Sequence, residues 1–148
     1  MKFLVYFSAV VSILAWQNSS AEQLKCQKGW KRFGDMSHML EIKVVSGKPE
    51  SVSYTGSTKL REDSLAYNCF FDANPKDKTI VWKDSGSRVQ IVGMAEKDTP
   101  DKLSLDYTAK RFTLNFEEFN HRYHCGQAAE PPKSITLIKG QETCEVVE

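Results

Sequence analysis

The sequence predicts an all-β fold: a small antiparallel β-sandwich or barrel of about ten short strands, stabilised by two disulfides. Three observations lead to this fold class. Short segments of alternating apolar and polar residues recur along the chain, separated by turn residues and spaced about 8 to 12 residues apart. Beyond the first residues, no segment places its apolar residues at helical spacing. The chain of 148 residues also contains four cysteines, an even number.

The N-terminal segment has the three regions of a secretory signal peptide. A basic residue, Lys2, precedes an apolar run over residues 3–16, and the small residues Ser19-Ser20-Ala21 follow. The apolar run is too short to span a membrane. We therefore expect residues 1–21 to be a signal peptide that is removed, and residues 22–148 to form a single all-β domain. An uncleaved amphipathic anchor is the alternative.

The net charge and the expected compartment limit which kinds of partner this domain can have. The chain has 20 Lys plus Arg and 19 Asp plus Glu residues, and loss of Lys2 with the signal leaves the domain formally neutral. Phosphate binding needs a basic surface or stripe, so a nucleic-acid partner is not expected. We expect a periplasmic or secreted protein with no membrane contact after signal removal. The lack of an Asn-x-Ser/Thr sequon after the signal fits the periplasm slightly better.

The cysteines are expected to form two disulfides, because exported domains fold under oxidising conditions. They are Cys26, Cys69, Cys125 and Cys144. Three pairings are possible, and we favour Cys26 with Cys69 and Cys125 with Cys144, because shorter loops close more readily. A zinc site is the alternative, but no cysteine pair has the close spacing that such sites usually have. No cofactor is expected.

The first part of the domain is predicted to contain a short strand and a hairpin. Residues 24–34 form a short strand, which Cys26 links to another part of the chain, followed by a turn that is bounded by glycines. Residues 35–39 form a polar connection. Residues 40–44 and 52–54 alternate in polarity and are joined by the turn Gly47-Lys48-Pro49, which predicts a hairpin with one buried face.

The stretch Leu65 to Asp72 is the clearest strand of the chain. Its alternate residues are expected to share one face that points into the core: Leu65, Tyr67, Cys69 and Phe71. A polar turn follows over residues 73–78. Asp72, just before the turn, and Asn74 and Asp77 within it could bind calcium, but Asx turns explain them better because the loop matches no full calcium-binding pattern.

The second half of the domain continues the alternating pattern. Strands are expected at residues 79–83, 88–94, 103–107, 112–116, 123–125, 135–137 and 143–147. The first two form a hairpin, and residues 95–102 form an exposed loop. The inward aromatic set is expected to fill the core and consists of Tyr54, Tyr67, Phe71, Trp82, Tyr107, Phe112, Phe116 and Tyr123. If these residues left space, a small barrel could instead bind an apolar ligand.

Two segments are candidate surfaces for a partner protein. The segment Trp30, Lys31, Arg32 and Phe33 mixes aromatic anchors with basic residues, which suits an acidic partner; a solvated edge is the alternative. The turn Ser85, Gly86, Ser87 and Arg88 and the loop of residues 127–132 can present contact residues on a rigid scaffold.

His121 and His124, close to Glu117 and Glu118, are weak candidates for a metal site or for a catalytic base. Three residues apart in a strand they would point to opposite faces, and only a helical turn would bring them together. No Gly-x-Ser-x-Gly elbow accompanies them, and cysteines in disulfides cannot act as nucleophiles. No metal and no catalytic residue is therefore assigned.

In architecture the chain resembles the small exported β-barrel inhibitors of lysozyme, which present a Ser-Gly turn to the enzyme cleft. The resemblance covers Ser85, Gly86, the exported cysteine-bearing chain and the strand-rich pattern, and it does not identify a family. Val89 stands where those families have a tyrosine. The resemblance implies an inhibitor whose turn enters a cleft of its partner.

The sequence thus leads us to expect an exported, non-enzymatic β-domain that acts by binding another macromolecule, as an inhibitor or an adaptor does. A small β-barrel that binds an apolar ligand is the alternative, and a hydrolase or metal protein using His121 or His124 is the third possibility.

Overall fold

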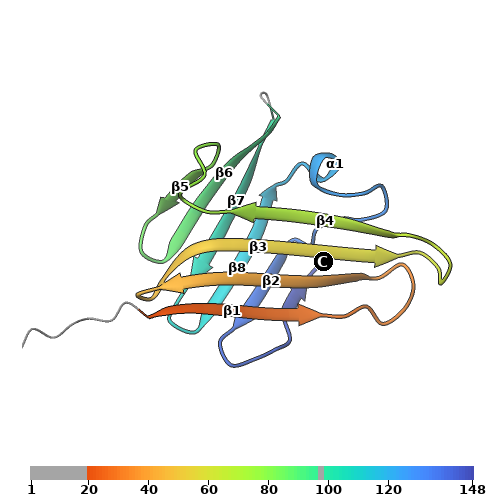
Figure 1. Ribbon diagram of the computed structural model, residues 1–148, viewed down its shortest axis with the longest axis horizontal. Helices are drawn as coiled ribbons and strands as arrows, with labels where there is room; N and C mark the ends of the chain where they lie inside the picture. The colour runs from red at the N-terminus through yellow and green to blue at the C-terminus, as the bar shows by residue number, and fades with distance from the viewer. Residues whose placement is uncertain (1–19, 97–98) are drawn as a thin grey trace, which may run out of the picture.

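The structure is a computed structural model that describes residues 20–96 and 99–148, without the side chains of residues 94–96. The described residues form two antiparallel sheets (Figure 1). The four-stranded sheet has the order β1 (Ala21–Lys28), β2 (Met36–Val45), β3 (Lys48–Lys59), β4 (Ala66–Ala73). The six-stranded sheet has the order β10 (Glu145–Val147), β9 (Ser134–Ile138), β8 (Arg111–Glu118), β7 (Thr99–Tyr107), β6 (Arg88–Glu96), β5 (Val81–Asp84). The predicted all-β class is confirmed, and the architecture is a sandwich.

Each sheet buries one face, as the alternation predicts. In β2 and β3, every second residue is buried over most of the strand. The predicted hairpin between them turns at Ser46 and Gly47, which both have positive φ, at 51° and 78°. Two consecutive residues with positive φ suit the right-handed twist of a two-residue hairpin loop, which explains why a glycine occupies this turn.

The core lies between the sheets, whose strands cross one another in Figure 1. Buried aliphatic residues from both sheets fill it, and aromatic rings meet edge to face: the ring centroids of Tyr54 and Phe116 are 4.9 Å apart and those of Phe116 and Phe119 are 5.2 Å apart. Tyr54, Phe71 and Phe112 are buried as expected. Tyr123 is the exception in the predicted inward set, because it is mostly exposed.

The two disulfides join Cys26 to Cys144 and Cys69 to Cys125, so the favoured pairing was wrong. Loop length distinguishes the possible pairings only weakly, because each doubling of the loop adds only about 0.6 kcal/mol to the entropic cost of closing it. The packing of the two sheets therefore decides the pairing. It brings residues 142–144, just before β10, beside β1, and it brings the segment after α1 (His121–His124) beside β4.

Both disulfides lie where the outer strands of the four-stranded sheet would otherwise expose their main chain. At β1, the main-chain N–H of Gln27 donates to Glu142 O at 2.8 Å, next to the Cys26–Cys144 bridge. At β4, Gly126 N–H donates to Asn68 O at 2.9 Å, next to the Cys69–Cys125 bridge. Covering an edge strand in this way blocks pairing with other chains.

Several local expectations were wrong. Leu65 does not face the core, because β4 begins at Ala66 and Leu65 is 87% exposed in the preceding loop. Residues 35–39 are largely the start of β2, in which His38 is buried. Residues 95–102 include the start of β7, in which Asp101 is buried, and residues 97–98 of that predicted loop lie outside the described residues.

Residues 123–125 do not form a core-facing strand. A single helical turn, α1, occupies residues 121–124 and contacts β4. Among the described residues, no helix has the length and apolar content needed to cross a membrane. The predicted signal peptide lies almost entirely outside the described residues.

Candidate functional site

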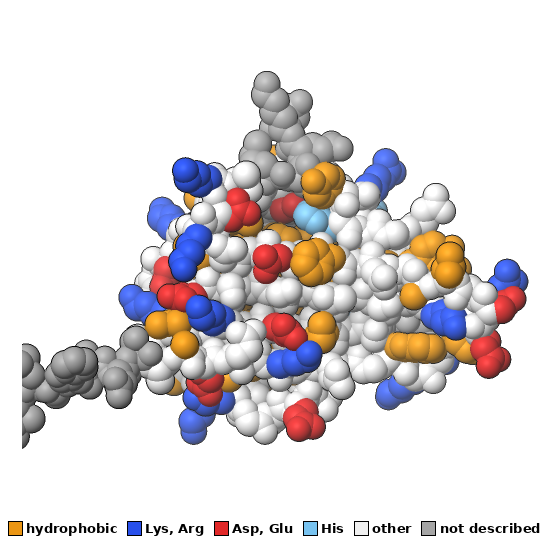
Figure 2. Space-filling view, in the orientation of Figure 1, with side chains coloured by type: hydrophobic (Ala, Val, Ile, Leu, Met, Phe, Trp, Pro, Cys, Tyr) orange, Lys and Arg blue, Asp and Glu red, His pale blue; other side chains and the backbone are white. Residues whose placement is uncertain are grey.

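Two loops lie together at one end of the four-stranded sheet and form what we call the loop-end surface, residues 29–35 and 60–65. The N–H of Gly34 donates to Lys59 O at 2.8 Å, and the hydroxyl of Thr58 donates to Asp35 O at 2.8 Å. The loops meet because β1 is joined to β2, and β3 to β4, at the same end. Figure 2 shows hydrophobic and charged side chains gathered at this end, on the right.

The loop-end surface exposes four large apolar side chains. Trp30 is 43% exposed, Phe33 46%, Leu60 50% and Leu65 87%. The rings of Trp30 and Phe33 are in contact, with centroids 5.5 Å apart. Leu60 and Leu65 thus lie on the loop adjacent to the one that carries Trp30 and Phe33, the two residues that sequence reasoning had selected. Clustered exposed apolar groups of this kind mark interaction sites more often than single ones do.

The charges of the loop-end surface are partly paired. Arg32 Nε lies 3.1 Å from Asp35 Oδ1, and the hydrogen bond from the Arg32 side chain holds the pKa of Asp35 below its usual value. Lys28 and Lys31 make no ion pair with any described residue. Arg61 is paired as well, with its Nε 3.0 Å from Asp63 Oδ1, so the charges without an ion partner among the described residues include Lys31 and Glu62 in the two loops and Lys28 beside them.

A cavity of about 610 Å³ adjoins the loop-end surface. Its walls come from residues 28–31 and 34–36, from the loop of residues 127–131 and from Glu148. Trp30, Met36 and Pro131 supply apolar contact. The charged residues of the lining are Lys28, Lys31, Asp35, Glu130 and Glu148. A concave site with apolar walls and a few charged groups is the usual form of a binding pocket.

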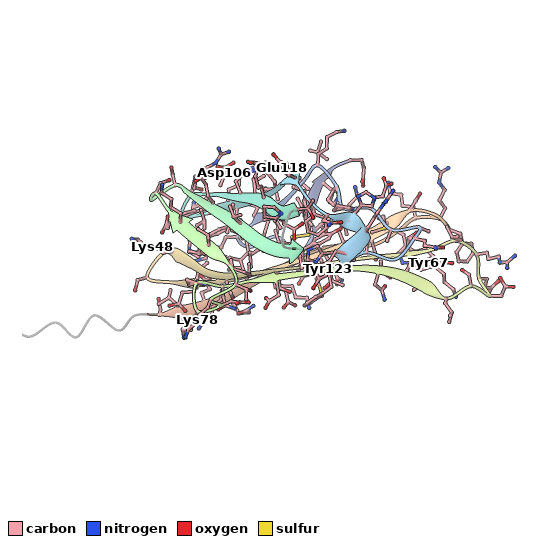
Figure 3. All side chains as sticks on the ribbon, turned by 90° about the horizontal axis from the view of Figure 1, so that it is seen from above. Lys48, Tyr67, Lys78, Asp106, Glu118 and Tyr123 are labelled. Carbon is pink, nitrogen blue, oxygen red and sulfur yellow. A yellow bond between two sulfur atoms is a disulfide. The ribbon has the colours of Figure 1, made fainter. Side chains whose placement is uncertain are left out.

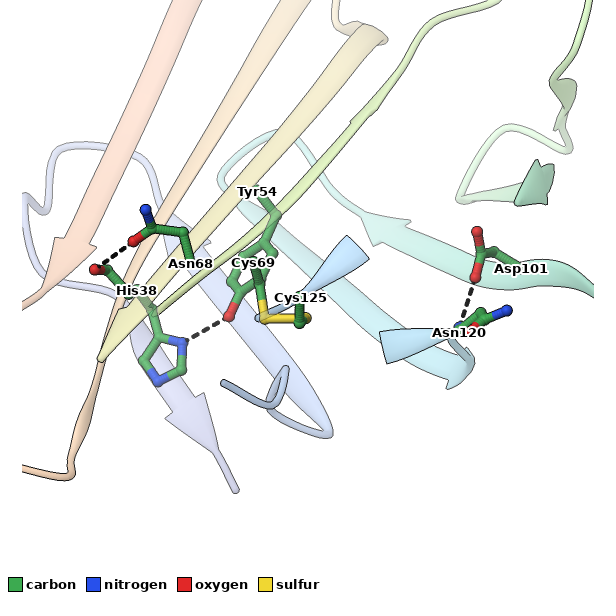
Figure 4. Close-up of a disulfide and its surroundings, with 8 residues drawn as sticks. His38, Tyr54, Asn68, Cys69, Asp101, Asn120 and Cys125 are labelled. Atoms are coloured by element: carbon green, nitrogen blue, oxygen red, sulfur yellow. Dashed lines mark hydrogen bonds between the residues drawn. A yellow bond between two sulfur atoms is a disulfide. The ribbon is translucent and has the colours of Figure 1, made fainter. Parts of the chain in front are cut away.

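Behind Glu148 lies a buried polar chain of side chains. The hydroxyl of Tyr54 is 3.0 Å from His38 Nδ1 (Figure 4), and His38 Nε2 is 3.4 Å from Glu148 Oε1. Burial raises the pKa of Tyr54 above its ordinary value, so the Tyr54 hydroxyl keeps its proton. Gly56 makes room for this contact, because a Cβ there would lie 2.5 Å from the Tyr54 hydroxyl oxygen.

His38 gives the protein an expected loss of stability in acid. Burial lowers the pKa of His38 below its ordinary value of 6.5, although the Glu148 carboxylate opposes this. The unfolded chain therefore binds a proton before the folded chain does, and stability falls as the pH drops below 6.5. Between about pH 7.5 and about pH 5.5, the protein should therefore lose more stability with His38 than with a residue that does not titrate at this position.

The measurement is urea unfolding at both pH values, for the wild type and for His38→Gln. The glutamine amide can keep a bond to Tyr54 but does not titrate, so the wild type should lose more stability than the variant. Equal losses in the two proteins would contradict this assignment, because the remaining histidines and carboxyls titrate in both.

The turn Ser85, Gly86, Ser87 and Arg88 lies at the end of the molecule away from the loop-end surface. Figure 3 places Lys48, at the β2–β3 turn, and Tyr67, near the loop-end surface, at opposite ends. Lys48 is close enough to Asp84, the residue just before the Ser85–Arg88 turn, for its positive charge to help lower the pKa of Asp84. The turn therefore lies at the Lys48 end. The two predicted contact segments are therefore not brought together.

Internal hydrogen bonds hold the Ser85–Arg88 turn. Gly86 N–H donates to Asp84 Oδ1 at 2.8 Å, and this bond contributes most to lowering the pKa of Asp84. Gly86 has a φ of +95°, which favours glycine. The Arg88 guanidinium donates to both carboxylate oxygens of Asp106, at 2.5 and 2.9 Å. The turn is exposed and internally hydrogen-bonded, but its arginine is already paired.

His121 and His124 lie on the helical turn but have different surroundings. His124 Nε2 is 2.6 Å from the buried Asp101 Oδ2, whereas His121 is exposed. Asp101 Oδ1 also accepts the main-chain N–H of Asn120 at 2.7 Å (Figure 4). In the described part of the chain, no three histidine, cysteine or acidic residues are grouped to hold a metal. The Asp101–His124 pair has the form of an oriented base, and here it fastens the helical turn to β7.

Sequence reasoning missed Leu60, Leu65, His38, Glu148 and Asp101 as parts of these sites. His38 and Asp101 stood in polar segments that resemble loops, and only their strand neighbours bury them. Leu65 carried a signal that was misread: it follows the charged run of residues 61–63, which is typical of a loop. Asn74 and Asp77 do form Asx turns, since their side chains accept the N–H groups of Lys76 and Thr79.

Comparison with known proteins gives no family: no protein-family model matches the chain, and no curated protein or solved structure matches it significantly.

Proposed function

We propose that this protein is an exported, disulfide-stabilised binding domain that recognises another protein through its loop-end surface. One observation carries the proposal: four large apolar side chains, Trp30, Phe33, Leu60 and Leu65, are exposed together on two adjacent loops. Aromatic anchors surrounded by polar groups are typical of the centre of a protein interface. The two disulfides support an oxidising compartment, and the periplasm or the cell exterior is the proposed location.

The charge around Trp30, at one side of this surface, favours an acidic group of the partner there. Lys28 and Lys31 flank Trp30, and neither is neutralised by an ion pair with a described residue. Basic groups at the rim of an interface increase the rate of association with an acidic surface. This increase becomes smaller at higher salt concentration, because salt screens the attraction. The proposed partner therefore presents an apolar patch bordered by carboxylates.

The test compares captures from the periplasmic or extracellular fluid of the protein's own host. The wild type, the double variant Trp30→Ala/Phe33→Ala and the control Val81→Ala are immobilised; Val81 is a 61% exposed apolar residue of β5. We expect a protein that the wild type and the control capture and that the double variant binds at least about tenfold more weakly. Urea unfolding checks that the double variant is folded.

Equal capture by all three proteins would contradict the proposed surface. Native mass spectrometry of protein from its own host separates the alternatives. A retained apolar molecule would favour the ligand-binding β-barrel function, and a retained metal lost in His124→Ala would favour the metal-protein function.

A further inference from the structure

The cavity beside the loop-end surface is lined by charges of both signs. Lys28 and Lys31 are basic, whereas Asp35, Glu130 and Glu148 are acidic. A site that selects an ion surrounds it with groups of the opposite charge, because like charges repel it. Neither an anion nor a cation meets such a set of groups in this cavity. The lining therefore suits a neutral polar molecule.

Several polar side chains of the lining have hydrogen-bonding capacity that the described residues do not use. Within residues 20–96 and 99–148, Lys28 and Lys31 form no ion pair. Over the same residues, Glu130 forms no ion pair and the side-chain amide of Gln127 forms no hydrogen bond. Ammonium groups donate hydrogen bonds, carboxylates accept them, and an amide does both. The cavity therefore offers donors and acceptors together.

A ligand that matches this mixture carries hydroxyl groups. A hydroxyl group donates a hydrogen bond and accepts others, so neighbouring hydroxyls can bond to an ammonium and to a carboxylate in turn. Hydrogen bonds in which one partner is charged are stronger than those between neutral groups. A pyranose ring holds several hydroxyls on a rigid frame, so it loses little conformational entropy when it binds. Among neutral polar ligands, a sugar thus satisfies the lining best.

Trp30 supplies the apolar surface that a sugar ring also needs. It lines the cavity and is 43% exposed. Phe33 contacts the indole, with ring centroids 5.5 Å apart, but does not line the cavity, so it supports Trp30 from another side. The C–H groups on one face of a pyranose ring pack on the electron-rich face of an aromatic ring. Met36 and Pro131 extend this apolar wall.

Both walls of the cavity are attached to the four-stranded sheet. The first wall connects β1 to β2. The second wall, residues 127–131, follows the Cys69–Cys125 bridge, and next to that bridge Gly126 N–H donates to Asn68 O at 2.9 Å. Ala129 in this wall is only 1% exposed, so it anchors the loop in the core. Walls that are already ordered cost little free energy to hold in place when a ligand enters.

We propose that this cavity binds a neutral saccharide, with a pyranose ring packed on Trp30 and hydroxyl groups hydrogen-bonded to Gln127 and Glu130. The cavity volume of about 610 Å³ lies within the range of small-molecule sites, about 300 to 1,000 Å³. The saccharide site goes beyond the proposed function and does not depend on it, because residues 127–131 lie outside the loop-end surface.

The first experiment screens the mature protein against immobilised neutral oligosaccharides of glucose, mannose, galactose and their N-acetylated amino sugars. An NMR titration then measures the Kd of a saccharide that binds, and the Trp30 indole N–H and the Gln127 side-chain amide signals should shift. We expect Trp30→Ala and Gln127→Ala/Glu130→Ala to bind it at least about tenfold more weakly than the wild type does. Val81→Ala changes an exposed residue outside the cavity and should bind it as the wild type does.

Three results would overturn the saccharide site. The first is no binding of any of these saccharides at about 10 mM. The second is equal binding by Trp30→Ala and the wild type, or equal shifts with glycerol, which would show only an unspecific affinity for hydroxyl groups. The third is tighter binding of acidic than of neutral saccharides that disappears at high salt concentration, because this would identify an ion site.

A second comparison separates the saccharide site from the protein-binding surface. Leu65 belongs to the loop-end surface but does not line the cavity, whereas Gln127 and Glu130 line the cavity only. Leu65→Ala should therefore keep its saccharide affinity within about twofold, and Gln127→Ala/Glu130→Ala should still capture the partner protein. A loss of saccharide binding in Leu65→Ala would contradict the placement in the cavity. Capture without saccharide binding would remove only the saccharide site, and the reverse result would remove only the proposed function.

Discussion

Replacing Cys26 and Cys144 with alanine is expected to lower the free energy of unfolding by roughly 3 to 5 kcal/mol. This bridge joins residues 118 positions apart, whereas the Cys69–Cys125 bridge spans 56 positions. A disulfide restricts the unfolded chain more as its loop lengthens, so the first double variant should lose slightly more stability than Cys69→Ala/Cys125→Ala. Urea unfolding of the wild type and both double variants measures the difference.

The location of this bridge adds a second reason for a large effect. Cys26 lies on the outer strand β1, and Cys144 precedes β10, the outer strand of the other sheet. Without the bridge, two main-chain hydrogen bonds of Gln27 hold the C-terminal segment against β1. A loss of less than about 1 kcal/mol in Cys26→Ala/Cys144→Ala would show that packing alone keeps the sheets together, against this expectation.

Asp101→Ala is expected to lower the free energy of unfolding by about 2 to 4 kcal/mol. The Asp101 side chain is almost completely buried and accepts hydrogen bonds from His124 and from the main chain of Asn120. Alanine leaves both groups unpaired in a site that water reaches poorly. The effect should concentrate on the helical turn α1 and on the adjoining Cys125, which a disulfide joins to β4.

Two comparisons make this prediction specific. Asp101→Asn keeps an oxygen for Asn120 N–H and should lose less stability than alanine does. Glu118→Ala removes a mostly exposed ion pair with Lys102 from the neighbouring strand and should change stability by less than about 1 kcal/mol. Urea unfolding measures all three, and hydrogen exchange at residues 120–126 locates the change. Similar losses in Asp101→Ala and Glu118→Ala would contradict the assigned role.

Much of the fold could be predicted from the sequence because it depends on local pattern. The alternation over residues 40–44 and 52–54 predicted a hairpin, and Ser46 and Gly47 close it as a two-residue turn. Cys69 and Phe71 were expected to face the core and do so. A strand reveals its buried face through a period of two, whichever strand it pairs with.

The candidate site was predicted only in part. Trp30 and Phe33 could be selected because an aromatic and basic mixture is visible in a few consecutive residues. Their neighbours Leu60 and Leu65 come from another hairpin, about thirty residues away, and no local pattern joins the two loops. Loop 60–65 meets loop 29–35 because two hairpins of one sheet turn at the same end.

By itself, then, the sequence determined the all-β class, the main strands, the even set of cysteines and one aromatic segment at the surface. The tertiary structure alone decided which cysteines pair, that His38 and Asp101 are buried, and that Glu148 lies beside His38. Strand periodicity acts between neighbouring residues, so it can be read from a single segment. Disulfide pairing and the burial of a polar residue depend on which distant strands pack together, and that choice is made by the free energy of the whole core.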